Sequence, residues 1–188
     1  MRIISGIFKG KKILDPKDIK TRPLKDLTKE SIFNIINHSK KFNINLKESV
    51  ILDLFSGVGS FGIECLSREA QKVIFVENYN GVLPILKKNL LSINPSHIYE
   101  ILEKNIYDKS TFSKFNDRFD LIFLDPPYKD KNLETVLNHI KEAEILKKSG
   151  VIIIHRHKKE IDTMPKGFKV IEEKKYGISK IIFLINSS

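Results

Sequence analysis

VILDLFSGVGSFG, at residues 50–62, is the stretch from which the fold can be predicted. Its first three residues are apolar, as in a buried parallel strand. Asp53 ends this run, and Gly57, Gly59 and Gly62 follow at the start of an expected helix over residues 61–68. A strand, a glycine turn and a helix N-terminus together predict a site where backbone N–H groups face a ligand.

Two kinds of ligand are compatible with this turn. Gly57–Gly62 matches the GxGxxG dinucleotide pattern, and Glu77 lies near the distance expected for a ribose-binding acid. Asp53, however, would repel a pyrophosphate group at the mouth of the turn. The same carboxylate suits a cationic ligand, such as the ammonium or sulfonium group of S-adenosylmethionine. The glycine pattern alone leaves both hypotheses open.

The pattern downstream of the turn alternates between strand and helix. We expect strands at 50–54, 72–77, 98–102, 119–124 and 150–155, and helices at 61–68, 82–91, 109–115 and 133–146. Two final strands, at 168–176 and 179–185, have no helix between them and predict an antiparallel hairpin. The alternation predicts a mostly parallel seven-stranded α/β sheet with helices on both faces, and a ligand site beyond the carboxyl ends of its strands.

The N-terminal part differs from the rest in charge. Residues 1–48 hold 12 Lys and Arg against 5 Asp and Glu, out of a net charge of +10 for the whole chain. This excess points to a polyanionic partner, although a solvated lysine-rich surface explains it equally well. We expect a small β-hairpin around Gly10 and a helix capped by Thr28 that runs to His38. The expected organisation is therefore a basic extension, residues 1–48, attached to a near-neutral α/β domain, residues 49–188.

The bulk composition is that of one globular protein. The 188 residues are 41% hydrophobic and 30% charged. No apolar run approaches the ~18 residues of a membrane span, and the first residues do not lead into a signal peptide. The single Cys65 permits no internal disulfide, which favours the cytoplasm, and we expect it to fill the core.

Asp125-Pro126-Pro127-Tyr128 decides between the two kinds of ligand. It follows the apolar run 121–124, at the same sheet edge as the Asp53 turn. An exocyclic base amine is a poor nucleophile because its lone pair is delocalised into the ring. The carboxylate of Asp125 and the carbonyl of Pro126 can hold its N–H groups and turn the lone pair outward. Tyr128 offers a face on which a flipped base can stack. A plain proline-rich turn is the alternative.

This tetrad resembles the DPPY or NPPY motif of amino-methyltransferases that modify adenine N6, cytosine N4 or guanine N2. Together with RIISGIFKGKKIL, TRPLKDLTKESIFNII, LDLFSGVGSFGIECLSR and a final YGISK, it resembles the bacterial RsmD-type family, class I methyltransferases of guanine N2 in 16S ribosomal RNA. These blocks extend over nearly the whole chain. A DNA or RNA adenine-N6 or cytosine-N4 methyltransferase is the alternative.

The resemblance implies roles for individual residues. The catalytic tetrad would be Asp125, Pro126, Pro127 and Tyr128, with no metal. The residues that would bind S-adenosyl-L-methionine are Asp53, Phe55, Ser56, Gly57, Gly59, Glu77, Asn105 and Ile106. The residues that would face 16S rRNA, within a small-subunit particle, are Arg2, Lys9, Lys11, Lys12 and Arg22. For Asn105, a helix N-cap before residues 106–115 is as good an explanation as adenine contact.

The chain departs from the family's pattern at three positions. Tyr79 stands where family members often have an acid, two residues after the ribose-binding glutamate. Pro84 is tolerated only if it falls in the first turn of the helix expected over residues 82–91. His155-Arg156-His157 replaces an acid that often ends the fifth strand. The two histidines share a strand face, but no carboxylate or cysteine nearby completes a metal set. We therefore expect a surface pair that does not touch the tetrad.

Overall fold

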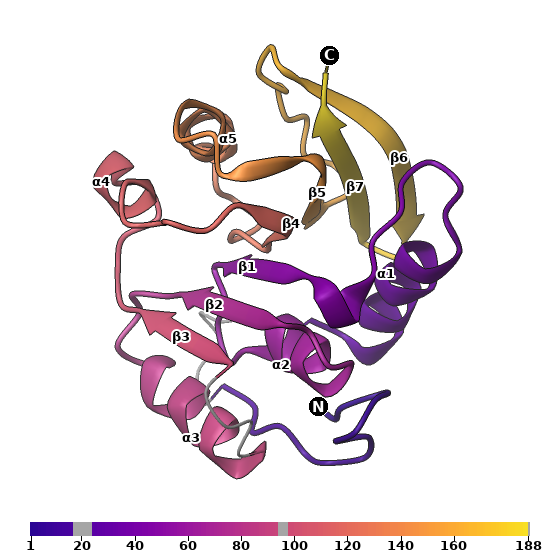
Figure 1. Ribbon diagram of the computed structural model, residues 1–188, viewed down its shortest axis with the longest axis vertical. Helices are drawn as coiled ribbons and strands as arrows, with labels where there is room; N and C mark the ends of the chain where they lie inside the picture. Colours follow the sequence, from indigo (N-terminus) through magenta and orange to yellow (C-terminus); the bar gives the residue numbers. More distant parts are fainter. Residues whose placement is uncertain (17–23, 94–97, 188) are drawn as a thin grey trace.

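The computed structural model describes residues 1–16, 24–93 and 98–187. Its central sheet has seven strands in the order β3-β2-β1-β4-β5-β7-β6 (Figure 1). The strands are β1 (Val50–Leu54), β2 (Lys72–Val76), β3 (Tyr99–Leu102), β4 (Phe119–Leu124), β5 (Leu146–His157), β6 (Phe168–Tyr176) and β7 (Ser179–Asn186). The first five strands are parallel, and β7 is antiparallel to both β5 and β6. The predicted sheet and its terminal hairpin are confirmed.

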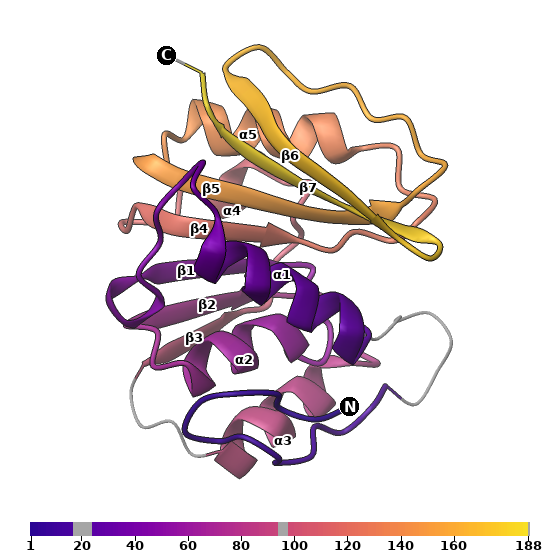
Figure 2. The same ribbon diagram turned by 90° about the vertical axis from the view of Figure 1, so that its right-hand side faces the viewer.

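Helices cover both faces of this sheet. The helices are α1 (Asp26–His38), α2 (Ser60–Ser67), α3 (Leu83–Ile93), α4 (Lys109–Phe112) and α5 (Leu133–Glu142), with a short 3-10 turn η1 (Leu46–Glu48) before β1. α1, α2 and α3 lie on one face, and α4 and α5 on the other (Figures 1 and 2). Pro84 falls in the first turn of α3, where a missing N–H costs nothing. Within the described residues, no helix is long and apolar enough to cross a membrane.

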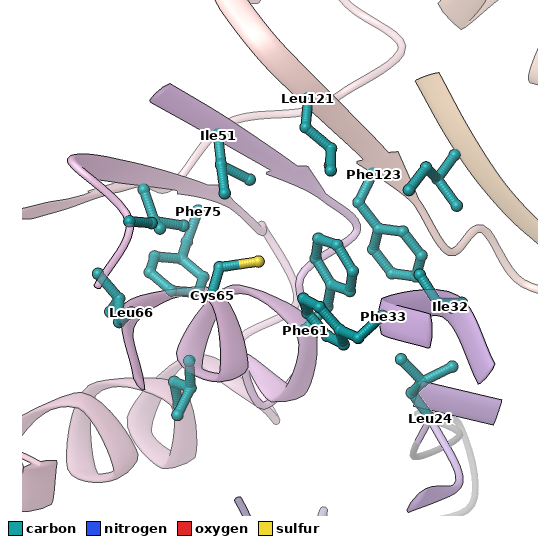
Figure 3. Packing of buried hydrophobic residues seen from close by; sticks show 14 of the residues in the cluster. Leu24, Ile32, Phe33, Ile51, Phe61, Cys65, Leu66, Phe75, Leu121 and Phe123 are labelled. Carbon is teal, nitrogen blue, oxygen red and sulfur yellow. The ribbon is translucent and has the colours of Figure 1, made fainter. Parts of the chain in front are cut away.

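Alternate side chains along the strands fill two separate cores. Ile51 and Phe123 point to the α1–α3 side, whereas Leu52 and Leu124 point to the α4–α5 side. On the first side, the ring of Phe61 stacks on that of Phe123, with ring centroids 3.9 Å apart (Figure 3). Cys65 is fully buried there, which confirms its predicted place in the core.

Gly62 lets α2 approach the sheet closely. A Cβ atom at this position would lie 2.3 Å from the ring of Phe75 on β2, well inside van der Waals contact. The third glycine of the pattern is thus required by helix–sheet packing. The first two glycines, Gly57 and Gly59, have positive φ angles of 55° and 85° and are required by the turn itself.

The N-terminal segment is a loop whose two arms pair over a shorter length than the predicted β-hairpin. One antiparallel bridge joins Arg2 to Lys12, with backbone hydrogen bonds from Ile3 to Lys11, from Gly10 to Ile3 and from Ile13 to Met1. The backbone N–H groups of Ile4 and Ser5 donate to the carboxylate of Glu64 on α2, at 2.8 and 2.9 Å. The pairing of the two arms therefore stops at Ile3, because the next N–H groups along the chain are bonded to α2. Ile3, on the same loop, is buried in the core that α1 and α2 share.

Two predicted helix boundaries were also wrong. α1 begins at Asp26, so that Thr28 lies inside the helix as a buried residue and does not cap it. α5 ends at Glu142, well before residue 146, because Glu144 adopts a left-handed conformation with a φ angle of 50°. The chain then enters β5 at Leu146, four residues earlier than predicted, through an irregular register before Gly150. Glu144 is neither glycine nor asparagine, so the sequence carries no signal for this turn.

Candidate functional site

The turn between β1 and α2 is held in an unusual backbone conformation. Phe55 has a φ angle of 59°, which costs a residue with a side chain about 1–3 kcal/mol. Gly57 and Gly59 follow with positive φ, so three left-handed residues fall within five positions. Such turns point successive N–H groups to one side, where they can meet a ligand. Strain of this kind is typical of a binding turn.

Asp53, at the end of β1, is almost fully buried beneath this turn. Its Oδ2 accepts a hydrogen bond of 2.9 Å from the backbone N–H of Gly62, in the first turn of α2. Burial raises the pKa of Asp53 well above its usual value, and the nearby carboxylates of Asp125 and Glu77 raise it further. Three carboxylates from neighbouring strand ends therefore converge here. A cation is the ligand that relieves their mutual repulsion.

Glu77, just after β2, binds the glycine turn from the next strand. Its Oε2 accepts a hydrogen bond of 2.8 Å from the N–H of Gly57, and its Oε1 accepts from the N–H groups of Asn78 and Tyr79. Ser56 donates its backbone N–H to the carbonyl of Val76, also in β2. The β1 and β2 ends are therefore fixed to each other, with the Glu77 carboxylate between them.

The Asp125–Tyr128 loop lies directly beside the glycine turn, because β4 is the neighbour of β1. Leu54 pairs with Leu124 in the parallel register, and the N–H of Asp125 donates to the carbonyl of Leu54 at 3.4 Å. Pro126 is buried and Pro127 is exposed. The hydroxyl of Tyr128 lies 2.8 Å from Oγ of Ser179 on β7. The structure brings together Asp53, Glu77 and Asp125, as the order of strands predicts.

His155 and Arg156 also belong to this site, and the prediction of a surface pair remote from the tetrad was wrong. Nδ1 of His155 lies 2.8 Å from Oδ1 of Asp125, and Arg156 donates to the carbonyl of Pro127 at 3.1 Å. The ring of His157 packs edge-on against Tyr128, with ring centroids 5.2 Å apart. The expected order of parallel strands could have predicted this contact. β4 and β5 are neighbours, Leu124 pairs with Ile154, and the next residues along the two strands are Asp125 and His155.

The residues after β3 take positions that differ in part from the predicted ones. Asn105 is not the predicted helix N-cap, because α4 begins only at Lys109 and is capped by Asp108, which accepts from the N–H of Ser110. Oδ1 of Asn105 instead accepts from the N–H of Tyr107 in the preceding turn. Ile106 is buried in the α4–α5 core. The rings of Phe55 and Tyr107 are in contact, with centroids 5.7 Å apart, and link this segment to the glycine turn.

Four of the five basic residues expected to face RNA lie on the N-terminal loop. Arg2, Lys9, Lys11 and Lys12 are exposed, and Arg22 lies outside the described residues. The loop is fixed to the site through Asn89 of α3, which bonds the backbone of Leu14 on one side and the carbonyl of Val58, in the glycine turn, on the other. In the parts of the chain that the structure describes, no His, Cys, Asp and Glu residues gather into a group of three that could hold a metal ion.

Comparison with known proteins gives related sequences over nearly the whole chain. Residues 1–185 match the model of a family described as conserved hypothetical protein 95. The chain is 32% identical over 179 residues to ribosomal RNA small subunit methyltransferase D of Haemophilus influenzae, across 95% of this chain and 90% of that protein. It is 34% identical over 164 residues to "Putative rRNA methyltransferase YlbH" of Bacillus subtilis, across 86% and 85% of the two chains.

The fold has close counterparts among solved structures. "Putative methyltransferase yhhF" from Escherichia coli is similar with a TM-score of 0.83 over 100% of this chain and 98% of that chain, at 23% sequence identity. This likeness extends over all seven strands and both helical layers. At such an identity it shows the fold, a Rossmann-like α/β arrangement.

Proposed function

Since the chain belongs to the conserved hypothetical protein 95 family, we propose that it transfers a methyl group from S-adenosylmethionine to the N2 amine of a guanine in small-subunit (16S) ribosomal RNA. The observation that carries the proposal is the position of Asp125. Its N–H bonds the strand that leads into the glycine turn, so the amine-orienting tetrad and the cofactor turn are immediate neighbours.

The residues of the glycine turn fit the proposed cofactor. S-adenosylmethionine carries an ammonium and a sulfonium group, and the carboxyl groups of Glu77 and Asp125 lie close to that of Asp53, which is buried beneath the turn. Glu77 keeps acceptor capacity for ribose hydroxyls, because a carboxylate has about four lone-pair sites and three are used by backbone N–H groups. A pyrophosphate would meet three carboxylates.

The chemistry requires orientation more than activation. When bound, S-adenosylmethionine supplies a strongly electrophilic methyl group. Asp125 and the carbonyl of Pro126 would accept the two N–H groups of the guanine amine, which turns its lone pair towards the cofactor. Tyr128 would stack on the flipped base. Its ring is fixed from two directions, by the hydroxyl contact with Ser179 and by the edge contacts with His155 and His157.

The direct test of the function is nucleoside analysis of 16S rRNA. Cells that lack this protein should lose one N2-methylguanosine from 16S rRNA, and expression of the intact protein should restore it. We expect the reaction in the cytoplasm, on either naked RNA or the small-subunit particle. If guanine methylation is unchanged and an N6-methyladenine or N4-methylcytosine is lost instead, the protein is an adenine or cytosine amino-methyltransferase and the proposed function is wrong.

Glu77→Ala is expected to weaken binding of S-adenosylhomocysteine at least tenfold. Loss of one hydrogen bond to a charged group costs about 1.5–3 kcal/mol, and each 1.4 kcal/mol is a factor of ten in affinity. Titration calorimetry measures this change, with NAD as the negative ligand. Glu103→Ala is the matched control, because Glu103 follows the adjacent strand β3 at the same edge and is half exposed. Binding of NAD with no binding of S-adenosylhomocysteine would exclude the proposed cofactor.

The lysines of the N-terminal loop are expected to set the salt dependence of RNA binding. Replacing Lys9, Lys11 and Lys12 with alanine should lower the slope of log K against log salt by about 0.7–0.9 for each phosphate that the loop no longer neutralises. Cofactor affinity should not change. The matched control replaces Lys148, Lys166 and Lys169, which are also exposed but lie near the amino-terminal ends of β5 and β6. Equal slopes for the two triple variants would mean that the loop lysines are ordinary solvated surface.

The loop should be tested by substitution and not by deletion. Although residues 1–48 carry most of the positive charge, Ile3, Ile13 and Ile32 are part of the core that covers the sheet. Deleting the segment would expose that core and confuse RNA binding with folding. We propose RNA docking for its exposed basic side chains alone.

A further inference from the structure

Two adjacent residues at the end of β5 hold the tetrad loop from different sides. Arg156 is buried, and its guanidinium donates to the carbonyl of Pro127 at 3.1 Å and to that of Asp130 at 2.8 Å. The Asp162 carboxylate accepts from the same guanidinium at 2.8 Å, which balances its charge. The backbone of the loop is therefore fixed by Arg156. The carbonyl of Pro126 accepts neither of these hydrogen bonds.

His155 contacts the side chain of Asp125, which the hydrogen bonds of Arg156 to the loop backbone do not restrain. The terminal torsion of an aspartate is broad and nearly two-fold, so an unrestrained carboxylate exchanges its two oxygens easily. Nδ1 of His155 lies 2.8 Å from Oδ1, and only 8% of the His155 side chain is exposed. The second oxygen, Oδ2, accepts no hydrogen bond from the part of the chain that the structure describes.

The surroundings of the ring decide its tautomer. Nε2 of His155 is buried and has no hydrogen-bond partner among the described residues. A hydrogen on Nε2 would be a buried donor without an acceptor, while Nδ1 would place its lone pair against a carboxylate oxygen; both are unfavourable. The arrangement with the hydrogen on Nδ1 avoids both penalties. His155 is then a donor to Asp125 through Nδ1, and the acceptor lone pair that remains is on Nε2, on the other side of the ring from the Asp125 carboxylate.

We propose that His155 is a positioning residue for methyl transfer, whose Nδ1–H holds Oδ1 of Asp125 so that Oδ2 faces the target amine. The inference rests on the proposed function, because the amine is the group that Oδ2 would meet. It assigns the N–H groups of the guanine amine to Oδ2 of Asp125 and to the carbonyl of Pro126. Restraining the carboxylate should speed the chemical step and leave cofactor binding unaffected.

Two variants of His155 form a matched pair. Asparagine places its side-chain NH₂ near the position of imidazole Nδ1 and keeps the donor, whereas leucine has the same branched shape without a donor. In single-turnover methyl transfer to 16S rRNA-containing particles, His155→Leu should be at least about tenfold slower than wild type. His155→Asn should stay within about threefold. Both variants should bind S-adenosylhomocysteine as tightly as the wild-type protein, so that the leucine variant loses methyl-transfer rate and not cofactor affinity.

The tautomer can be measured without any substitution. Nitrogen-15 NMR of the histidine rings in the wild-type protein should show His155 with a hydrogen on Nδ1 and none on Nε2. This measurement keeps the inference testable even where the leucine variant does not fold. A hydrogen on Nε2 alone would overturn it, as would equal single-turnover rates for a folded His155→Leu variant and the wild-type protein.

The outcomes separate this inference from the function on which it rests. If the wild-type protein does not methylate 16S rRNA, the proposed function fails, whatever the tautomer is. If the wild-type protein methylates and the asparagine and leucine variants are slowed equally, the function stands and the positioning role of the His155 donor is excluded. Rescue by asparagine alone supports both.

Discussion

Asp125→Ala is expected to slow single-turnover methyl transfer about a thousandfold and to leave cofactor affinity near wild type. Alignment of reacting groups can lower a barrier by up to ~7–11 kcal/mol, and a thousandfold effect requires only about 4 kcal/mol of this. The rate falls because the amine loses one of its two acceptors and its lone pair stays delocalised in the base. The backbone of the loop should persist, since Arg156 bonds its carbonyls and not the Asp125 side chain.

The comparison with Asp117→Ala controls for the loss of a carboxylate on the same segment. Asp117 lies just before β4, is partly exposed and pairs with Lys72, far from the carboxyl ends of the strands. Its replacement should leave the rate unchanged. A near-normal rate for Asp125→Ala would exclude the orienting mechanism, even if the protein still proved to be a methyltransferase.

Glu64→Ala is expected to destabilise the protein by about 3–5 kcal/mol, the usual effect of breaking a buried ion pair. Glu64 on α2 and Lys29 on α1 are both fully buried, with 3.6 Å between Nζ and Oε2. Burial lowers the pKa of Lys29, and the charge of Glu64 opposes that shift. The substitution leaves the Lys29 ammonium with less compensation, and it also leaves the N–H groups of Ile4 and Ser5 without their acceptor.

Urea unfolding measures this effect as a shift of the midpoint at a constant slope. Glu69→Ala is the control, because Glu69 follows the same helix, is half exposed and pairs with Lys47 at the surface. Exposed pairs contribute about 0–1 kcal/mol, so the control should be close to wild type. A loss below about 1 kcal/mol for Glu64→Ala would mean that Asp26, whose Oδ1 lies 3.8 Å from Nζ of Lys29, is enough to compensate the buried ammonium.

The sheet, and the position of the Asp125–Tyr128 loop beside the glycine turn, could be predicted because their signals are local. Buried parallel strands are continuous apolar runs, and the residues at their carboxyl ends must meet at one edge. Asp53, Glu77 and Asp125 therefore lie together as expected. The order of the strands also places His155 beside Asp125, whereas the lack of further metal ligands near the two histidines in the sequence predicted only a surface pair.

The features that the sequence did not reveal depend on distant contacts. The N-terminal pairing is short because Glu64, about 60 residues away, accepts from the N–H groups of Ile4 and Ser5, which would otherwise continue it. The end of α5 is set by a left-handed Glu144, a conformation that its residue type does not favour. The buried ion pair of Lys29 and Glu64 joins α1 to α2, and nothing in the sequence distinguishes these two charged residues from the exposed ones.

The position of β7 in the sheet has a consequence for synthesis. β7 follows β6 in the chain, yet it lies between β5 and β6 and bonds both. As the chain emerges from the ribosome, β6 therefore has no partner strand until β7 has been translated, and the edge of β5 remains open for the same interval. Ser179, the contact of the Tyr128 hydroxyl, also arrives with β7. A nascent chain that has reached only β6 should expose an unpaired strand edge and lack the Ser179 contact of Tyr128. A pause in translation at that point should therefore favour aggregation.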